Sequence, residues 1–178
     1  MKALLHNFDS RVTRDIQRWP EWVRPIMLLA TLIGQPIFTV GAGALVAGLG
    51  LGASNMGLVM AGMLAVATFF ACTLLKLYFR RDRPVTEYVA KMRFGTYSMP
   101  SGHAAGAAAS FGLLAIIVCQ TLISPWSYIF AVFVAATIFL IGVSRIYLGA
   151  HYPSDVFVGW ILGLLGLGTI IFVAQPYV

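Results

Sequence analysis

The chain has 178 residues and a formal net charge of +6, with 60% hydrophobic and only 10% charged residues. No charge occurs in residues 25–75, 104–144 or 156–178. Because a helix that crosses the ~30 Å hydrocarbon layer needs about 20 residues, these runs predict a membrane protein and argue against a soluble one with buried helices. The basic total does not by itself indicate a nucleic-acid partner, and we expect none.

Residues 7–23 predict an amphipathic helix. Its apolar stripe consists of Phe8, Val12, Ile16, Trp19 and Val23. Its charged face consists of Arg11, Arg14, Asp15 and Arg18. We expect it to lie in the membrane interface, within a segment 1–24, with Asn7 or Asp9 as its N-cap. A surface helix of a soluble protein is the alternative that this short stripe leaves open.

The uncharged runs predict five membrane-spanning helices, which form a bundle over residues 26–174. The predicted spans are Ile26–Gly48, Leu58–Phe79, Ala104–Leu122, Tyr128–Leu148 and Val156–Ala174. Pro36 predicts a kink in the first span. Cys72 and Cys119 fall inside spans and are expected to pack rather than to form a disulfide. We therefore expect residues 1–178 to form a single, all-α, membrane-embedded domain.

Residues 80–99 form the only long polar loop. Its basic residues Arg80, Arg81, Lys91 and Arg93 are interpreted as interfacial anchors. Lys76 differs, because it lies one turn inside the apolar boundary, where a charge is costly without a partner. Arg83 follows it by seven residues, so the two share a helix face.

Two further polar segments border the spans. Pro100–His103, with the sequence PSGH, is compatible with a phosphate-binding turn that enters a helix, although a Ser-Gly pair there is more often a cap. Residues 144–155 read SRIYLGAHYPSD. His151 and Asp155 are four residues apart and can touch on a helix, and Pro153 suits a first helical turn.

Counting the crossings brings these segments to one membrane boundary, because five spans place the N-terminal helix, the 80–103 loop and the 149–155 turn on the same side. All twelve Lys and Arg residues then lie on that side. The predicted site consists of Lys76, Arg83, Ser101, His103, Arg145, His151 and Asp155. Three cations, two histidines and one carboxylate suit a phosphate ester and the groups that cleave it.

The three polar segments resemble the three signature motifs of the type 2 phosphatidic acid phosphatase superfamily, which are integral membrane lipid phosphatases. KLYFRRDRP has the form Lys, six residues, Arg-Pro; PSGH is intact; and SRIYLGAHYPSD has the form Ser-Arg, five residues, His, three residues, Asp. The resemblance covers roughly residues 76–155. Six-span members have three helices before the first motif, whereas this chain has two predicted spans there.

The resemblance implies hydrolysis without a metal or any other cofactor, through a phosphohistidine intermediate. His151 would be the nucleophile, Asp155 would orient its ring, and His103 would act as acid and then as base. The residues that would hold the phosphoryl oxygens are Lys76, Arg83, Ser101, Gly102 and Arg145.

The implied partner is a lipid phosphate or diphosphate in the bilayer, such as undecaprenyl diphosphate, phosphatidylglycerol phosphate or phosphatidic acid. No residue chooses among these lipids, and none indicates an oligomeric state. The positive-inside rule would place the charged side in the cytoplasm. Bacterial relatives generally carry the site on the outer face, so we expect a multi-pass protein of the cell membrane with an extracytoplasmic site.

Two alternatives stay open. A metal-dependent hydrolase could draw its ligands from His103, His151, Asp155, Asp82 and Glu87, although three nearby cations would repel a metal. A non-catalytic transporter or binder of anionic lipids could use the same basic cluster, since charges inside the membrane also mark transport paths.

Overall fold

The computed structural model describes residues 2–92 and 95–174, and every regular element in these ranges is a helix. In chain order the elements are α1 (Lys2–Gln17), η1 (Glu21–Val23), α2 (Arg24–Ile33), α3 (Pro36–Gly52), α4 (Met56–Phe79), α5 (Glu87–Ala90), α6 (Gly102–Gly106), η2 (Ala107–Phe111), α7 (Gly112–Thr121), α8 (Trp126–Tyr147) and α9 (Pro153–Ala174). The 3-10 turn η1 joins α1 to α2, whereas η2 is a π-helical turn that makes one continuous span with α6 and α7.

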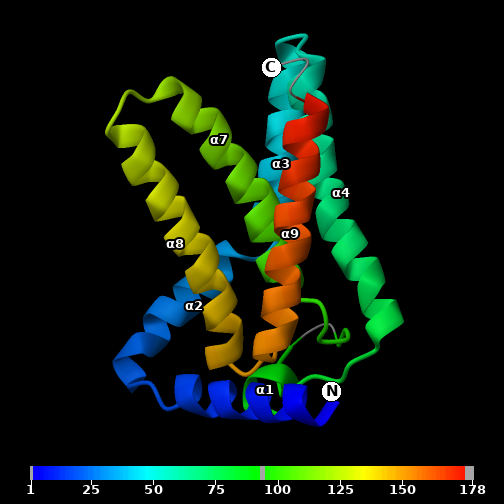
Figure 1. The fold of residues 1–178 in the computed structure, drawn as a ribbon, viewed down its shortest axis with the longest axis vertical. Coiled ribbons are helices and arrows are strands. Elements are labelled where there is room, and N and C mark those ends of the chain that lie inside the picture. The colour runs from blue at the N-terminus through cyan, green and yellow to red at the C-terminus, as the bar shows by residue number, and fades with distance from the viewer. Residues whose placement is uncertain (1, 93–94, 175–178) are drawn as a thin grey trace.

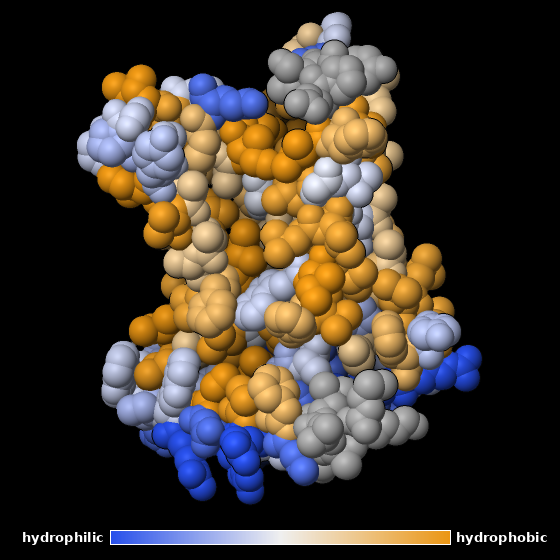
Figure 2. Space-filling model, viewed as in Figure 1, coloured by the Kyte–Doolittle hydropathy of each residue, from blue (hydrophilic) through white to orange (hydrophobic). Residues whose placement is uncertain are grey.

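Four of the five predicted spans are confirmed, and the first predicted span corresponds to a bent pair of helices. Four helical segments are long and apolar enough to cross a membrane, and the bent pair formed by residues 21–33 and 36–52 gives a fifth. Figure 1 shows these segments running up and down the molecule, with α1 lying across the end at which α8 and α9 are joined. Hydrophobic residues cover the flank of the molecule in Figure 2, and hydrophilic residues gather at the α1 end. The protein is therefore a multi-pass, all-α membrane protein.

The first span is broken, as Pro36 predicts, and α2 meets α3 at 41°. Gln35, which precedes the proline, adopts an extended conformation with φ −62° and ψ 149° because the proline ring disfavours a helical residue before it. The predicted end at Gly48 is wrong, since α3 continues to Gly52. Gly50 serves close packing rather than a turn, since a Cβ on it would lie 2.6 Å from the Val59 nitrogen of α4.

The N-terminal helix differs from the prediction in both bounds and cap. It begins at Lys2 and ends at Gln17, because Pro20 lacks the N–H that a continuing helix needs. Asp9 lies inside this helix and is buried, so it is not its N-cap. Ile16 packs into the cluster of Ala104, Ile146 and Val156. Part of the apolar stripe therefore faces the bundle rather than lipid.

Candidate active site

A polar cavity of about 370 Å³ lies at the α1 end of the bundle, where the α2–α3 break, α4, α6 and α8 approach one another. Its walls carry six of the predicted site residues together with apolar and polar neighbours. The lining residues are Gln35, Pro36, Phe69, Thr73, Lys76, Arg83, Tyr88, Met92, Thr96, Gly102, His103, Arg145 and His151. Segments that are far apart in the sequence thus meet in one site, as the count of crossings predicts.

Three cationic side chains reach this cavity, and neutral groups hold each of them. Lys76 Nζ donates to the Tyr97 carbonyl at 3.0 Å. Arg83 Nε donates to the Thr96 carbonyl at 2.6 Å, and its Nη1 donates to the Ala150 carbonyl at 2.9 Å. Burial and then the charge of Arg145 lower the pKa of Arg83.

Arg145 is the most buried of the three, with 1% of its surface exposed, although it belongs to a membrane span. Its Nη1 donates to the Tyr88 hydroxyl at 3.1 Å and also contacts the Thr31 hydroxyl of α2. Among residues 2–92 and 95–174, none of these three cations forms an ion pair with a carboxylate. Because buried charges are costly without a counter-charge, the cavity is suited to an anion.

His151 lies in the turn between α8 and α9 and is buried. Its Nε2 lies 3.4 Å from Arg83 Nη1, while its Nδ1 lies 3.7 Å from Asp155 Oδ2. Burial and then the positive charges of Arg145, Arg83 and Lys76 hold the pKa of His151 well below its usual value. The imidazole is therefore neutral at pH 7, and with a proton on Nδ1 the Nε2 lone pair can accept from Arg83 Nη1.

Asp155 lies in the first turn of α9 and is fully buried behind His151. Its Oδ2 accepts from the Tyr152 N–H at 2.9 Å, and its Oδ1 accepts from Arg81 Nη1 at 2.9 Å. The Ser101 N–H donates to the Asp155 carbonyl at 2.9 Å, so the PSGH segment rests directly on α9. A Cβ on Gly159 would lie 2.6 Å from the Ser101 carbonyl, which shows how closely the two segments approach.

His103 lies on the first turn of α6 and lines the cavity together with His151. A Cβ on Gly34 would lie 3.4 Å from His103 Cδ2, so the end of α2 packs beside the ring. The structure thus places two imidazoles on one cavity, and only His151 has a carboxylate beside it. This difference suits one histidine to nucleophilic attack and the other to proton transfer.

Ser101 and Gly102, which were both expected to hold the phosphoryl oxygens, lie at different depths. Gly102 lines the cavity, whereas Ser101 is fully buried behind it. The Ser101 N–H is already bonded to Asp155, and its hydroxyl has no hydrogen-bond partner among the described residues. The Ser101 N–H therefore joins two helices, and a contact between its hydroxyl and a phosphoryl oxygen stays a prediction.

Several residues of the site were missed or misread in the sequence. Arg81 is not an interfacial anchor: its guanidinium forms ion pairs with Asp155 at 2.9 Å and with Asp9 at 2.6 Å. Arg80 and Lys91 are exposed, as expected of anchors, and Arg93 lies outside the described residues. Tyr88 and Thr31, which hold Arg145, carried no sequence signal because neither belongs to a motif.

The described residues contain no group of three or more His, Cys, Asp or Glu side chains that could hold a metal ion. Asp82 and Glu87, two ligands of the metal-dependent alternative, are exposed, and neither lines the cavity. Both cysteines are free, as expected.

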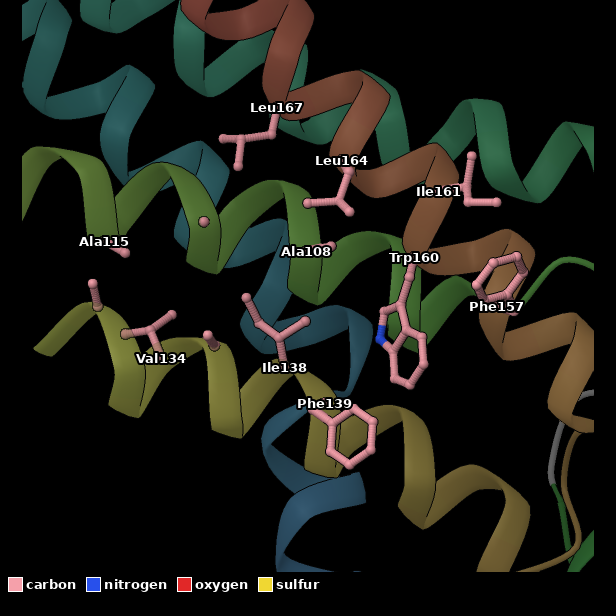
Figure 3. Close-up of a pocket in the computed structure, with 13 residues that line it drawn as sticks. Ala108, Ala115, Val134, Ile138, Phe139, Phe157, Trp160, Ile161, Leu164 and Leu167 are labelled. Atoms are coloured by element: carbon pink, nitrogen blue, oxygen red, sulfur yellow. The ribbon is translucent and has the colours of Figure 1, made fainter. Parts of the chain in front are cut away.

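A second cavity, of about 490 Å³, lies between α7, α8 and α9. Figure 3 shows its apolar lining, which includes Ile138, Phe139, Trp160 and Leu164. No charged side chain lines it, so this cavity is not suited to a phosphate.

The fold and the cavity define a helical membrane protein with three cationic side chains and a histidine beside an aspartate at one end of the bundle. Residues 55–177 match the family model of the PAP2 superfamily. The chain belongs to this superfamily.

Similar proteins agree with this assignment. The chain is 32% identical over 93 residues to phosphatidylglycerophosphatase B of Bacillus subtilis, a match that spans 51% of this chain and 45% of the relative. It is 38% identical over 77 residues to an undecaprenyl-diphosphatase of Sulfolobus acidocaldarius, across 43% of this chain and 33% of the relative. The chain thus spans less than half the length of these curated relatives.

The fold is similar to the crystal structure of the first transmembrane PAP2 type phosphatidylglycerolphosphate phosphatase from Bacillus subtilis. The TM-score is 0.82 at 21% identity, over 97% of this chain and 87% of that chain. At this identity the likeness concerns the fold.

Proposed function

We propose that this protein is a membrane lipid phosphatase that hydrolyses the terminal phosphate of a lipid phosphate or diphosphate through a phosphohistidine. The observation that carries the proposal is the cavity in which Lys76, Arg83 and Arg145 have no carboxylate partner among the described residues, beside a neutral His151. A doubly charged phosphoryl group would supply the missing negative charge.

In the first step His151 Nε2 attacks phosphorus and forms a P–N bond while the P–O bond to the lipid breaks. His103 would serve as the acid that gives a proton to the departing oxygen. Asp155 accepts the Nδ1–H of the imidazole and stabilises the positive charge that the ring acquires. The 3.7 Å separation of Nδ1 and Oδ2 would need to shorten to hydrogen-bond length as the charge develops.

In the second step water attacks phosphorus, and the P–N bond breaks to return neutral His151 and inorganic phosphate. His103, now neutral, accepts the proton of the water. Lys76, Arg83 and Arg145, with the Gly102 N–H, would stabilise the equatorial oxygens in both steps. The chemistry draws only on side chains of this chain and needs no cofactor.

The lipid tail would leave the cavity on the side where α2 turns away from α4. Gln35 and Pro36 of the break and Phe69 and Thr73 of α4 line that side of the cavity. A cavity at the membrane boundary explains why the enzyme would be membrane-embedded, since the phosphate stays at the surface while the tail stays in the bilayer.

Undecaprenyl diphosphate, phosphatidylglycerol phosphate and phosphatidic acid are the candidate substrates, and the names of the curated relatives support a lipid phosphate. The proposed location is the cell membrane, with the site on the extracytoplasmic face.

The test is phosphate release by the purified full chain in liposomes that contain each candidate lipid, with and without a strong chelator. We expect release from at least one lipid and no effect of the chelator. His151→Asn should abolish release, whereas Thr169→Ala, at an exposed position of α9, should leave it unchanged. Binding of the lipids without release would indicate the transporter or binder, and loss of release with the chelator would indicate the metal enzyme.

A further inference from the structure

Arg81 joins two carboxylates that come from opposite ends of the chain. Its Nη1 donates to Asp155 Oδ1 at 2.9 Å and its Nη2 donates to Asp9 Oδ2 at 2.6 Å. The guanidinium lies over the Tyr152 ring, 4.1 Å from its centroid, and the Arg81 carbonyl accepts from the Ser98 N–H at 2.7 Å. Both the backbone and the plane of this side chain are therefore held in place.

Asp9 reaches this cluster from α1 and is itself fully buried. Its Oδ1 accepts from the Ser154 N–H at 2.9 Å, and its Oδ2 accepts from the Ser154 hydroxyl at 2.7 Å. Ser154 lies in the first turn of α9, where N–H groups lack partners within the helix. A carboxylate from α1 thus caps the helix that carries Asp155.

Because Arg81 binds two carboxylates, it occupies only one oxygen of Asp155 and leaves the other oxygen beside His151. Arginine prefers to bind both oxygens of one carboxylate, and Asp9 prevents this by engaging Nη2. Asp155 Oδ2 stays on the Tyr152 N–H and beside His151 Nδ1. Without Asp9, Arg81 could take both Asp155 oxygens and compete with His151 for the carboxylate. Burial opposes the charge of Arg81, but the hydrogen bond to Asp9 and the charges of Asp155 and Asp9 outweigh it and raise the pKa of Arg81.

We infer that Asp9 and Arg81 are positioning residues, which hold Asp155 in the orientation that serves His151 and so make α1 a part of the catalytic apparatus. The inference rests on the proposed function. Neither residue lines the cavity, so neither touches the substrate. Their effect should therefore fall on the chemical step rather than on substrate binding.

The test measures kcat and KM for phosphate release by the full chain, alongside the thermal stabilisation that inorganic phosphate confers. Asp9→Asn keeps the shape and an oxygen for the Ser154 N–H but removes the charge that holds Arg81. Arg81→Lys keeps the charge but cannot bridge two carboxylates with a planar fork. Each should lower kcat roughly tenfold to a hundredfold, the effect of losing a hydrogen bond to a charged group. KM and the stabilisation by phosphate should stay near the parental values.

The matched controls are Asp15→Asn, at an exposed position of α1, and Arg80→Lys, at the exposed neighbour of Arg81. Both should keep the parental kcat. The double variant Asp9→Asn/Arg81→Lys should lose less than the product of the two single losses, because both act on one carboxylate. If Asp9→Asn gives no monodisperse protein, the kcat and the phosphate stabilisation of Arg81→Lys alone test the inference.

Two results would overturn the inference while the parent still releases phosphate. One is a kcat in both variants equal to that of the controls. The other is a parallel loss of kcat and of the stabilisation by phosphate, which would mean that the cluster only supports the fold. Absence of release by the parent itself would instead overturn the proposed function.

Discussion

Arg83 lies against His151, with Nη1 of the guanidinium 3.4 Å from Nε2 of the imidazole. The ring is thus flanked by a cation at one nitrogen and by the Asp155 carboxylate at the other. A guanidinium in this place disfavours a proton on Nε2, which in the proposed mechanism is the nitrogen that attacks phosphorus. A phosphate that binds Arg83 would therefore also act on the proposed nucleophile.

The pH dependence follows from this contact. Burial and the nearby cations lower the pKa of His151. The ring therefore stays neutral at pH values below about 6.5, the ordinary pKa of histidine. Removing one cation should raise this pKa, so Arg83→Gln should move the acid limb of phosphoenzyme formation to higher pH. Single-turnover labelling of the parent and the variant across pH measures the shift, and the titration of the substrate cancels in the comparison. An acid limb that stays in place or moves to lower pH would contradict the assignment of this limb to the titration of His151.

The hydroxyl that holds Arg145 should matter for binding. Tyr88→Phe removes an acceptor 3.1 Å from Arg145 Nη1 and leaves the buried guanidinium with one fewer partner. A hydrogen bond to a charged group contributes about 1.5–3 kcal/mol, so we expect KM to rise roughly tenfold or more. Steady-state kinetics measure the change. Tyr78→Phe, at an exposed position of α4, is the control and should match the parent.

The cavity should bind inorganic phosphate even without turnover. A ligand that binds only the folded state stabilises it by about 2.7 kcal/mol at a hundred times its Kd. Thermal unfolding of the His151→Asn variant should therefore shift upward with phosphate, whereas the further change Arg145→Gln should reduce the shift. An equal shift in both proteins would place the anion elsewhere.

The approach of α9 to the PSGH segment leaves no room for a larger side chain at Gly159. A Cβ there would lie 2.6 Å from the Ser101 carbonyl. Gly159→Val should therefore push α6 away from α9, cost about 1–3 kcal/mol of stability and lower the activity. Thermal unfolding and phosphate release measure both effects. Gly168→Ala on the same helix has open space around it and should be tolerated.

The five spans could be predicted because uncharged runs of sufficient length leave little choice of path through a bilayer. The convergence of Lys76, His103 and His151 followed from the same count, since an odd or even number of crossings decides the side of each loop. The break before Pro36 followed from the chemistry of proline alone.

The Asp9–Arg81 pair could not be predicted, because its members are 72 residues apart and meet only through the way α1 lies across the bundle. A stripe of apolar residues does not distinguish a helix that faces lipid from one that packs on protein, and Ile16 does the latter. The position of Ser101 likewise depends on the loop that precedes it. Which N–H groups of a first helical turn stay free is a property of the tertiary contacts, not of the motif.

The cap that Asp9 places on Ser154 has a practical consequence. The family match begins at residue 55, well after α1. A truncated protein designed on those boundaries would keep every signature residue, yet the Ser154 N–H and the second nitrogen of Arg81 would lose their acceptors. Variant libraries and grafted active sites that are built from the three motifs alone would lack these two acceptors. A sequence alignment of the motifs would not reveal the loss.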